Sequence, residues 1–160
     1  TLVAQQIGAG RLRSARLAGN AGIRLAVILA VTVGGLIWLA RAQIIAAYTP
    51  DPDVMATALP LFFFIGFYQL FDAFQVGTAF VLRAYKVALI PTVMYAVALW
   101  GVGLGGGYLL GFNVLGMTPV SLQGAAGFWL GNSVSLALVG AALIWYLRRV
   151  QKLMEREYQQ

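Results

Sequence analysis

Long hydrophobic stretches separated by short charged segments dominate the pattern of this chain. Residues 25–47 contain one charged residue, Arg41, residues 54–82 contain only Asp72, and residues 87–147 contain none. Crossing the hydrocarbon core of a bilayer takes about 20 residues of helix. Each of the first two stretches is therefore long enough for one membrane span, and the third is long enough for two.

The third stretch has to turn back once, and the turn is predicted between Asn113 and Gln123, where glycine, proline, hydroxyl and amide side chains collect. The four predicted spans cover about residues 24–48, 54–82, 88–111 and 123–147. No segment shows the apolar–polar alternation of a half-buried strand. The pattern therefore predicts an all-α fold, a polytopic membrane bundle of four transmembrane helices.

The charged residues between the predicted spans alternate in sign along the chain. Arginines precede the first span, Asp51 and Asp53 follow it, Arg83 and Lys86 follow the second, and a basic segment at residues 148–156 follows the last. Loops rich in lysine and arginine stay in the cytoplasm. Both ends of the chain are therefore predicted to be cytoplasmic.

These spans divide the chain into two parts. Residues 1–22 are interpreted as the end of a preceding helix plus a cytoplasmic basic loop. Residues 23–160 are interpreted as the four transmembrane helices with a cytoplasmic C-terminal tail. The chain begins at Thr1 rather than Met, so we expect it to be a piece of a longer membrane protein.

Composition excludes several classes of function. Of the 160 residues, 61% are hydrophobic and 10% are charged, with a mean hydropathy of +0.82, whereas soluble domains are about 45–50% apolar and about 25% charged. The chain has no cysteine and no histidine, so it lacks thiol nucleophiles, imidazole bases and the commonest metal ligands. The net charge of +6 fits the flanks of membrane helices better than nucleic-acid binding. The expected partner is the lipid bilayer, with no nucleic acid.

Asp72 is the one acidic residue inside a predicted span. An ionised aspartate near the bilayer centre costs about 2.5–3.5 kcal/mol, and such residues usually mark ion or substrate pathways. At about 100° per residue, Tyr68, Gln69 and Gln75 fall within about 60° of Asp72 around the helix. The second span therefore has a narrow polar stripe, which we expect to face a bundle interior or a wet cavity.

A single carboxylate at this depth can take up a proton, or it can hold a Na⁺ ion with help from Tyr68 and carbonyl oxygens. Either event changes the charge of the site and can bias a carrier between two states. Asp72 and Tyr68 are the candidate cation-binding residues, and Gln69 and Gln75 are candidates for lining a cavity. No metal site beyond this Na⁺ site is predicted. The structural alternative is a hydrogen-bond cluster that only joins helices.

An enzyme is not expected. No second acid, histidine, cysteine or paired serine lies near Asp72 in the sequence, so general acid–base catalysis would lack a partner. The glycines of the third span do not follow a strand, as a phosphate-binding loop would require. Gly103, Gly107 and Gly111, and then Gly127 and Gly131, are instead spaced at four, which favours close helix packing or a bend.

Four segments carry a resemblance to a known family: Leu2–Arg11, Tyr68–Val76, Tyr95–Leu110 and Gly124–Gly131. In that order they are similar to the loop after the eighth helix, and to the tenth, eleventh and twelfth helices, of the multidrug and toxic compound extrusion (MATE) family. The chain resembles the C-terminal third of these proteins, nearest the bacterial NorM-like branch. The tenth-helix segment, with Leu82-Arg83 after it, is the most specific of the four.

The resemblance implies part of the C-terminal lobe of a twelve-helix efflux transporter in a bacterial inner membrane. Such a transporter exchanges cationic or amphipathic compounds for Na⁺ or H⁺ by alternating access, and needs no other cofactor. The N-terminal part of the same transporter is then a partner of this chain. The cation-site acid and tyrosine of the tenth helix correspond to Asp72 and Tyr68. The chain departs from the family at residues 84–87, where Ala-Tyr-Lys-Val replaces the usual Gly-Asp-Thr.

Two other interpretations stay open at this point. A lipid-linked oligosaccharide flippase of the same superfamily would keep the fold and change the cargo, although such proteins carry more charge in their central cavity. A four-span membrane scaffold subunit without transport activity would use the polar stripe for assembly alone.

Overall fold

The computed structural model describes residues 1–158, which are almost entirely helical and contain no strand. Four helices in this part are long and apolar enough to cross a membrane: α2 (Leu12–Leu39), α4 (Pro52–Ala84), the segment Leu89–Gly111 and α7 (Ala125–Glu157). Leu89–Gly111 consists of α5 (Leu89–Val97), a π-helical segment η1 (Ala98–Gly105) and α6 (Gly106–Gly111). The remaining elements are α1 (Leu2–Gly8), α3 (Arg41–Tyr48) and a short 3₁₀ turn η2 (Val120–Leu122). The predicted all-α bundle of four membrane helices is confirmed.

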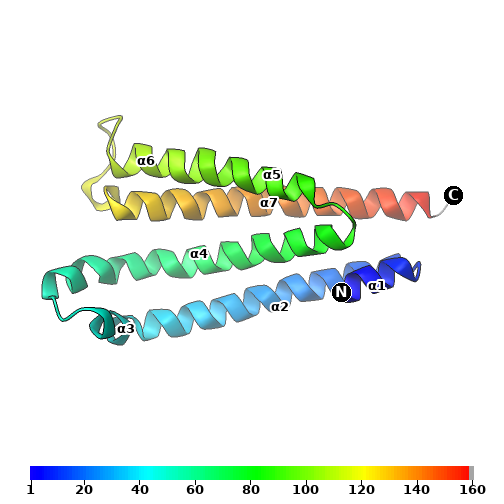
Figure 1. Cartoon of the computed structure of the whole chain (residues 1–160), viewed down its shortest axis with the longest axis horizontal. Coiled ribbons are helices and arrows are strands. Elements are labelled where there is room, and N and C mark those ends of the chain that lie inside the picture. The colour runs from blue at the N-terminus through cyan, green and yellow to red at the C-terminus, as the bar shows by residue number, and fades with distance from the viewer. Residues whose placement is uncertain (159–160) are drawn as a thin grey trace.

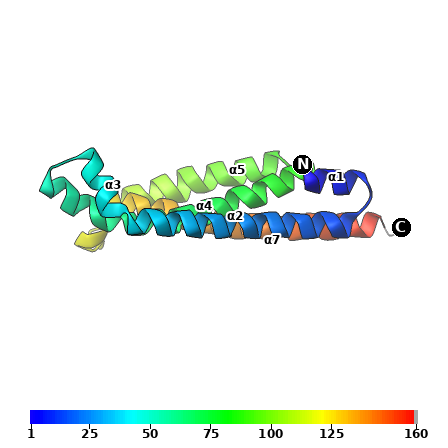
Figure 2. The ribbon, with the colours of Figure 1, turned by 90° about the horizontal axis from the view of Figure 1, so that it is seen from below.

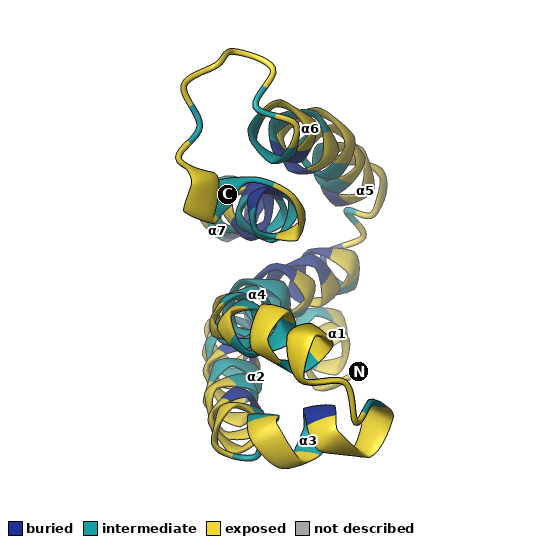
Figure 3. Ribbon diagram, turned by 90° about the vertical axis from the view of Figure 1, so that its left-hand side faces the viewer, coloured by how far each residue is buried: buried dark blue, intermediate teal, exposed yellow. Residues whose placement is uncertain are grey.

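Helix α4 lies in the middle of the bundle. It packs against α2 on one side and α7 on the other, while η1 and α6 pack along α7 (Figure 1). In the end view, buried residues gather where α4 and α7 face each other (Figure 3). The fully buried side chains with the largest volumes all come from these two helices: Thr78, Leu82, Ser135, Leu136, Leu143 and Leu147.

Charge divides between the two ends of the bundle. The start of α2 and the C-terminal ends of α4 and α7 lie together at one end (Figure 1), and these segments carry every arginine and lysine except Arg41. We call this the basic end. Asp51, the N-cap residue of α4, and Asp53, in its first turn, lie at the opposite end. Glu155 and Glu157 of α7 lie at the basic end, where arginine and lysine outnumber them. This separation is the one that the positive-inside rule associates with the two faces of a membrane.

The beginning of the first membrane helix differs from the prediction. We expected the first span to begin at about residue 24, after the end of a preceding helix and a basic loop in residues 1–22, but α2 begins at Leu12. Ala15, Gly19 and Ile23 are buried and lie about one turn apart, so this segment has an inward face of its own. Packing of that face against α4 keeps the segment helical, because tertiary contacts supply most of the stability of a helix.

The same helix ends before the predicted span of residues 24–48 does. It stops at Leu39, and α3 continues from Arg41 in a different direction (Figure 2). The Arg41 Nη1 group donates a hydrogen bond of 2.7 Å to the Trp38 carbonyl oxygen, and the guanidinium lies 4.0 Å from the centre of the Trp38 ring. Arg41 thereby satisfies a carbonyl at the end of α2, where backbone acceptors lose their helical partners.

The start of α4 follows the sequence signals closely. Asp51 is the N-cap residue, and its Oδ1 accepts hydrogen bonds from the Asp53 N–H at 2.9 Å and the Val54 N–H at 3.4 Å. Pro52 occupies the first helical position, where its missing N–H has no cost. The acid–proline run therefore starts the helix as well as ending the preceding turn.

The C-terminal end of α4 contains a strained residue. The Val87 N–H donates to the Leu82 carbonyl at 3.0 Å and the Lys86 N–H donates to the Arg83 carbonyl at 2.9 Å, which is the hydrogen-bond pattern of a Schellman motif. Lys86 has a φ of 62°, in the left-handed region that glycine adopts most easily. Lysine is therefore strained at a position that usually carries glycine.

The last two membrane helices meet through glycine, as the spacing of four predicted. A Cβ atom on Gly131 would lie 2.7 Å from the Gly103 carbonyl oxygen and 2.7 Å from the Gly107 nitrogen. A Cβ on Gly127 would lie 2.6 Å from the Gly111 nitrogen. These distances leave no room for a side chain, so the backbones of η1, α6 and α7 are in direct contact.

We predict that Gly131→Ala lowers the stability of the full-length protein by about 1–3 kcal/mol, because the added methyl group must push two backbones apart. The matched control is Gly106→Ala, since a Cβ on Gly106 meets no atom within 4 Å. The thermal unfolding midpoints of both variants in detergent check the prediction. Equal midpoints for the two variants would contradict the proposed backbone contact.

We predict that Lys86→Gly raises the stability by about 1 kcal/mol, because glycine adopts the left-handed conformation without the cost that other residues incur. Lys86→Ala serves as the control, since it removes the charge and keeps the strain. A rise in unfolding midpoint for both variants would show that charge, rather than backbone conformation, is responsible.

Candidate functional site

Asp72 lies in the middle of α4 and is partly exposed. Tyr68 is one turn earlier on the same face and is also partly exposed. The Tyr68 ring makes an edge-to-face contact with Trp129 of α7, with 5.6 Å between ring centres. This contact holds the phenol in place between α4 and α7, beside the candidate carboxylate.

A third polar group approaches from α5. Tyr95 lines a cavity together with Gln75 of α4, and Tyr68 and Tyr95 both pack against the same hydrophobic core cluster. The structure thus brings together the two predicted cation-binding residues and a second phenol from another helix. Tyr95 was missed as a site residue because it lies in a charge-free span, where nothing in the local pattern distinguishes it from core tyrosines.

A cavity of about 270 Å³ lies between α4 and α5, on the basic-end side of Asp72. Its polar lining consists of Gln75, Arg83, Thr92 and Tyr95. Gln75 and Arg83 are within about 60° of Asp72 around α4, so the cavity and the carboxylate share one face of this helix. We call this the polar face of α4.

Gln75 is the most deeply placed member of this set. Its side chain is only 5% exposed, and its Oε1 atom accepts no hydrogen bond from the described residues 1–158. A buried acceptor without a partner costs about 1–3 kcal/mol. Such a cost is typical of sites where a ligand, an ion or water supplies the missing partner.

Gln69 is placed differently. It lies against α2, where its Cβ atom is 3.9 Å from the position that a Cβ on Gly34 would occupy. It therefore sits at the α2–α4 contact, whereas Gln75 lines the cavity between α4 and α5. The two amides belong to different surroundings although they lie equally close to Asp72 on a helical wheel.

Polar groups of α7 add to the interior. The Asn132 Oδ1 and Ser133 Oγ atoms are buried without hydrogen-bond partners in the described part of the chain. A Cβ on Gly103 of η1 would lie 2.7 Å from Asn132 Oδ1, so this amide is packed against the π-helical turn. The Ser135 hydroxyl donates within α7, to the Asn132 carbonyl at 2.8 Å. Segments of π-helix are frequent at functional sites.

The donor set defines what the site can do. One carboxylate accompanied by phenol and amide oxygens can bind a proton or a monovalent cation through oxygen atoms. Among residues 1–158, no group of three or more acidic, histidine or cysteine side chains is positioned to hold a metal ion. A Na⁺ ion at Asp72 would need further oxygen ligands from the backbone or from outside this chain.

Comparison with known proteins gives a consistent result. The MatE family profile matches residues 1–109. A probable multidrug resistance protein NorM from Aromatoleum aromaticum is 38% identical over 151 residues, covering 94% of this chain and 32% of the relative. The multidrug resistance protein PmpM of Pseudomonas aeruginosa is 38% identical over 146 residues, covering 91% of this chain and 30% of the relative. A probable NorM protein from Halalkalibacterium halodurans is 34% identical over 154 residues, covering 96% of this chain and 32% of the relative. This chain therefore spans about a third of the length of these curated relatives.

We predict that Gln75→Met raises the unfolding midpoint of the substrate-free protein, by an amount equivalent to about 1 kcal/mol, because it removes a buried acceptor without a partner. Gln123→Met is the matched control, since the Gln123 amide donates a hydrogen bond of 2.9 Å to the Thr118 carbonyl and its loss should lower the midpoint. A comparable loss of stability in both variants would show that Gln75 has a structural partner in the full-length protein.

Proposed function

Because this chain belongs to the MatE family, we propose that the full-length protein is a secondary active multidrug efflux transporter of a bacterial inner membrane. This chain would contribute the last third of it, including four membrane helices of the C-terminal lobe. The basic end would face the cytoplasm, in line with the charge separation between the two ends of the bundle. The names of the relatives favour this function over an oligosaccharide flippase or a scaffold subunit, because all three are multidrug resistance proteins.

The observation that carries the proposal is the polar face of α4. A carboxyl group, a phenol and an unpartnered amide lie within two turns of one membrane helix, next to a cavity. A scaffold helix could associate through amides alone and would not need an acid, which costs more at this depth. A carrier needs a group whose charge changes when the coupling ion arrives.

The free-energy cost of an ionised Asp72 in the membrane is large enough to support a switching role for this residue. An ionised aspartate near the bilayer centre costs about 2.5–3.5 kcal/mol. Neutralisation by H⁺ or Na⁺ removes most of this cost in a closed, dry conformation and matters little in an open, wet one. A differential free energy of this size changes the ratio of two conformations by roughly a hundredfold, which is within the usual range of coupling between binding sites.

Exchange follows if cationic compounds and the coupling ion compete for the same carboxylate. With neither bound, Asp72 is charged and disfavours the closed state. Binding of either one neutralises it and permits the change of access, so the downhill ion and the outgoing compound move in opposite directions. Aromatic residues beside the polar stripe, such as Tyr68 and Tyr95, would supply faces that attract organic cations.

We predict that Asp72→Asn in the full-length protein lowers ion-driven efflux of a cationic dye by roughly tenfold to a hundredfold, because the amide no longer changes charge. The variant should purify with the wild-type elution profile, since an amide fits the same space. Efflux from inverted membrane vesicles or loaded cells measures the effect. Asp53→Asn, an exposed acid at the opposite end of α4, is the control and should retain activity. Wild-type efflux by Asp72→Asn would rule out this role.

A further inference from the structure

A second concave site lies on the opposite side of α4 from Asp72. A cavity of about 420 Å³ lies between α2 and α7, lined by Arg16, Asn20, Arg24, Phe74, Arg148 and Gln151 among others. We call these six residues the basic groove. Phe74 is two residues after Asp72, which places it about 200° away around the helix. The basic groove is therefore separate from the polar face of α4.

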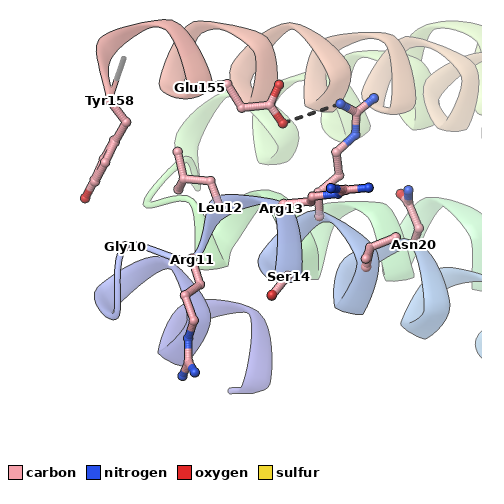
Figure 4. Close-up of a pocket in the computed structure, with 10 residues that line it drawn as sticks. Gly10, Arg11, Leu12, Arg13, Ser14, Asn20, Glu155 and Tyr158 are labelled. Carbon is pink, nitrogen blue, oxygen red and sulfur yellow. Dashed lines mark hydrogen bonds and ion pairs between the residues drawn. The ribbon is translucent and has the colours of Figure 1, made fainter. Parts of the chain in front are cut away.

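The charged lining of this cavity is exclusively positive. Three arginines line it, and none of its lining residues is acidic. The nearest acid is Glu155, which pairs with Arg16 at 3.4 Å and lines an adjoining cavity of about 800 Å³ that shares Arg16 and Asn20 (dashed line in Figure 4). Within residues 1–158, Arg24 and Arg148 form no ion pair. The groove thus offers two guanidinium groups without a counter-ion.

A buried donor also faces the groove. Gln151 is 3% exposed, lines the cavity, and its Nε2 group has no hydrogen-bond partner of standard geometry in the described residues. Gln151 lies beside the Tyr85 hydroxyl and lowers the pKa of this phenol as a hydrogen-bond donor, whereas burial raises that pKa above its ordinary value. Tyr85 therefore offers no negative charge, and it competes for only one of the two Gln151 N–H groups. A buried N–H donor beside unpaired guanidinium groups is a suitable environment for a phosphate oxygen.

An apolar cavity lies along two of the helices that line the basic groove, α4 and α7. This cavity has a volume of about 330 Å³ and lies further from the basic end than the basic groove does. It is lined by Phe67, Phe71, Ala137 and Leu138 among others. Its lining is apolar except for Ser133. We call this the apolar groove.

The two grooves lie on the same helix faces. On α7, Ala137 of the apolar groove and Gln151 of the basic groove are two heptads apart, so they point in nearly the same direction. On α4, Phe67, Phe71 and Phe74 recur at intervals of four and three. The two cavities share no lining residue, and the Phe74 ring packs against Gly140 of α7 between them. We call the two grooves together the track; a ligand that occupies both must turn the Phe74 ring aside.

This track lies on the other side of the bundle from α1 and α5. Figure 2 shows α1 and α5 to one side of α2 and α7. The polar face of α4 is on the side of α5, because its cavity is lined by both helices. The α2–α7 side therefore lies away from α1 and from the cavity that α4 shares with α5.

We propose that this track binds one anionic phospholipid. Its phosphate lies among Arg24, Arg148 and Gln151, and its acyl chains follow the apolar groove past Phe71 toward Ala137. Basic pockets between membrane helices at the cytoplasmic side are known to hold anionic head groups. The proposal concerns a different face from the transport site and does not depend on the identity of the transported compound.

The test uses the full-length protein, purified in detergent and depleted of lipid. Binding of dipalmitoyl phosphatidylglycerol, dipalmitoyl phosphatidylcholine and inorganic phosphate is compared by native mass spectrometry and by the shift in unfolding midpoint. We expect phosphatidylglycerol to bind more tightly than phosphatidylcholine. The double variant Arg24→Gln/Arg148→Gln should bind it about thirtyfold more weakly, and each single variant about fivefold more weakly. Arg149→Gln is the matched control, since Arg149 is next in the chain but does not line the cavity.

The acyl-chain part of the proposal is tested on the wild-type protein and on one further variant. Dihexanoyl phosphatidylglycerol should bind the wild type more weakly than the dipalmitoyl lipid, and Ala137→Phe should abolish this difference by filling the apolar groove. Equal loss of binding in Arg149→Gln and the double variant would overturn the proposal, because it would indicate a general surface charge effect. Competition by millimolar inorganic phosphate, or affinity independent of chain length, would assign the site to a free anion and overturn the lipid assignment.

Discussion

A carboxyl group in the hydrocarbon layer is the costly feature around which this bundle is arranged. The ionised group costs about 2.5–3.5 kcal/mol, so the helix that carries it must be held by strong packing elsewhere. Helix α4 has that support on two sides, from α2 and from the α7 contact that buries Leu82, Leu143 and Leu147. Backbone contact between α7 and η1 through Gly103 and Gly131 in turn fixes the position of α5, which precedes η1 and carries Tyr95.

The two faces of α4 are suited to different environments. One presents Asp72, Gln75 and a cavity shared with α5, where an acceptor is left without a partner. The other presents phenylalanines over a track that ends among arginines. The transporter proposed above would need both kinds of surface, because its moving parts must contact water and substrate on one side while lipid supports them on the other. We infer that α4 separates these two environments within this lobe.

Much of the architecture could be predicted from the sequence, since charge gaps fix the number of spans and the acid–proline run at Asp51 fixes the start of α4. The early start of α2 was missed because three small or apolar residues one turn apart are hidden among arginines. Its end at Leu39 depends on a hydrogen bond from Arg41, which hydropathy does not reveal. For the site, helical spacing placed Tyr68 on the same side of α4 as Asp72, but it could not separate Gln69 from Gln75 or add Tyr95. Those distinctions depend on which neighbouring helix lies beside each residue.

Water accessibility of the two faces of α4 tests this account most directly. Val76 and Phe67 are exposed to similar extents, 37% and 44%, on the polar and aromatic faces respectively. Each is replaced by cysteine in a full-length protein that carries no other cysteine, and labelling in intact membranes is measured with a membrane-impermeant, water-soluble maleimide on the basic-end side. The account predicts rapid labelling of Val76→Cys and little labelling of Phe67→Cys. Equal labelling at both positions, or labelling of Phe67→Cys alone, would contradict the assignment of a wet polar face and a lipid-facing aromatic face.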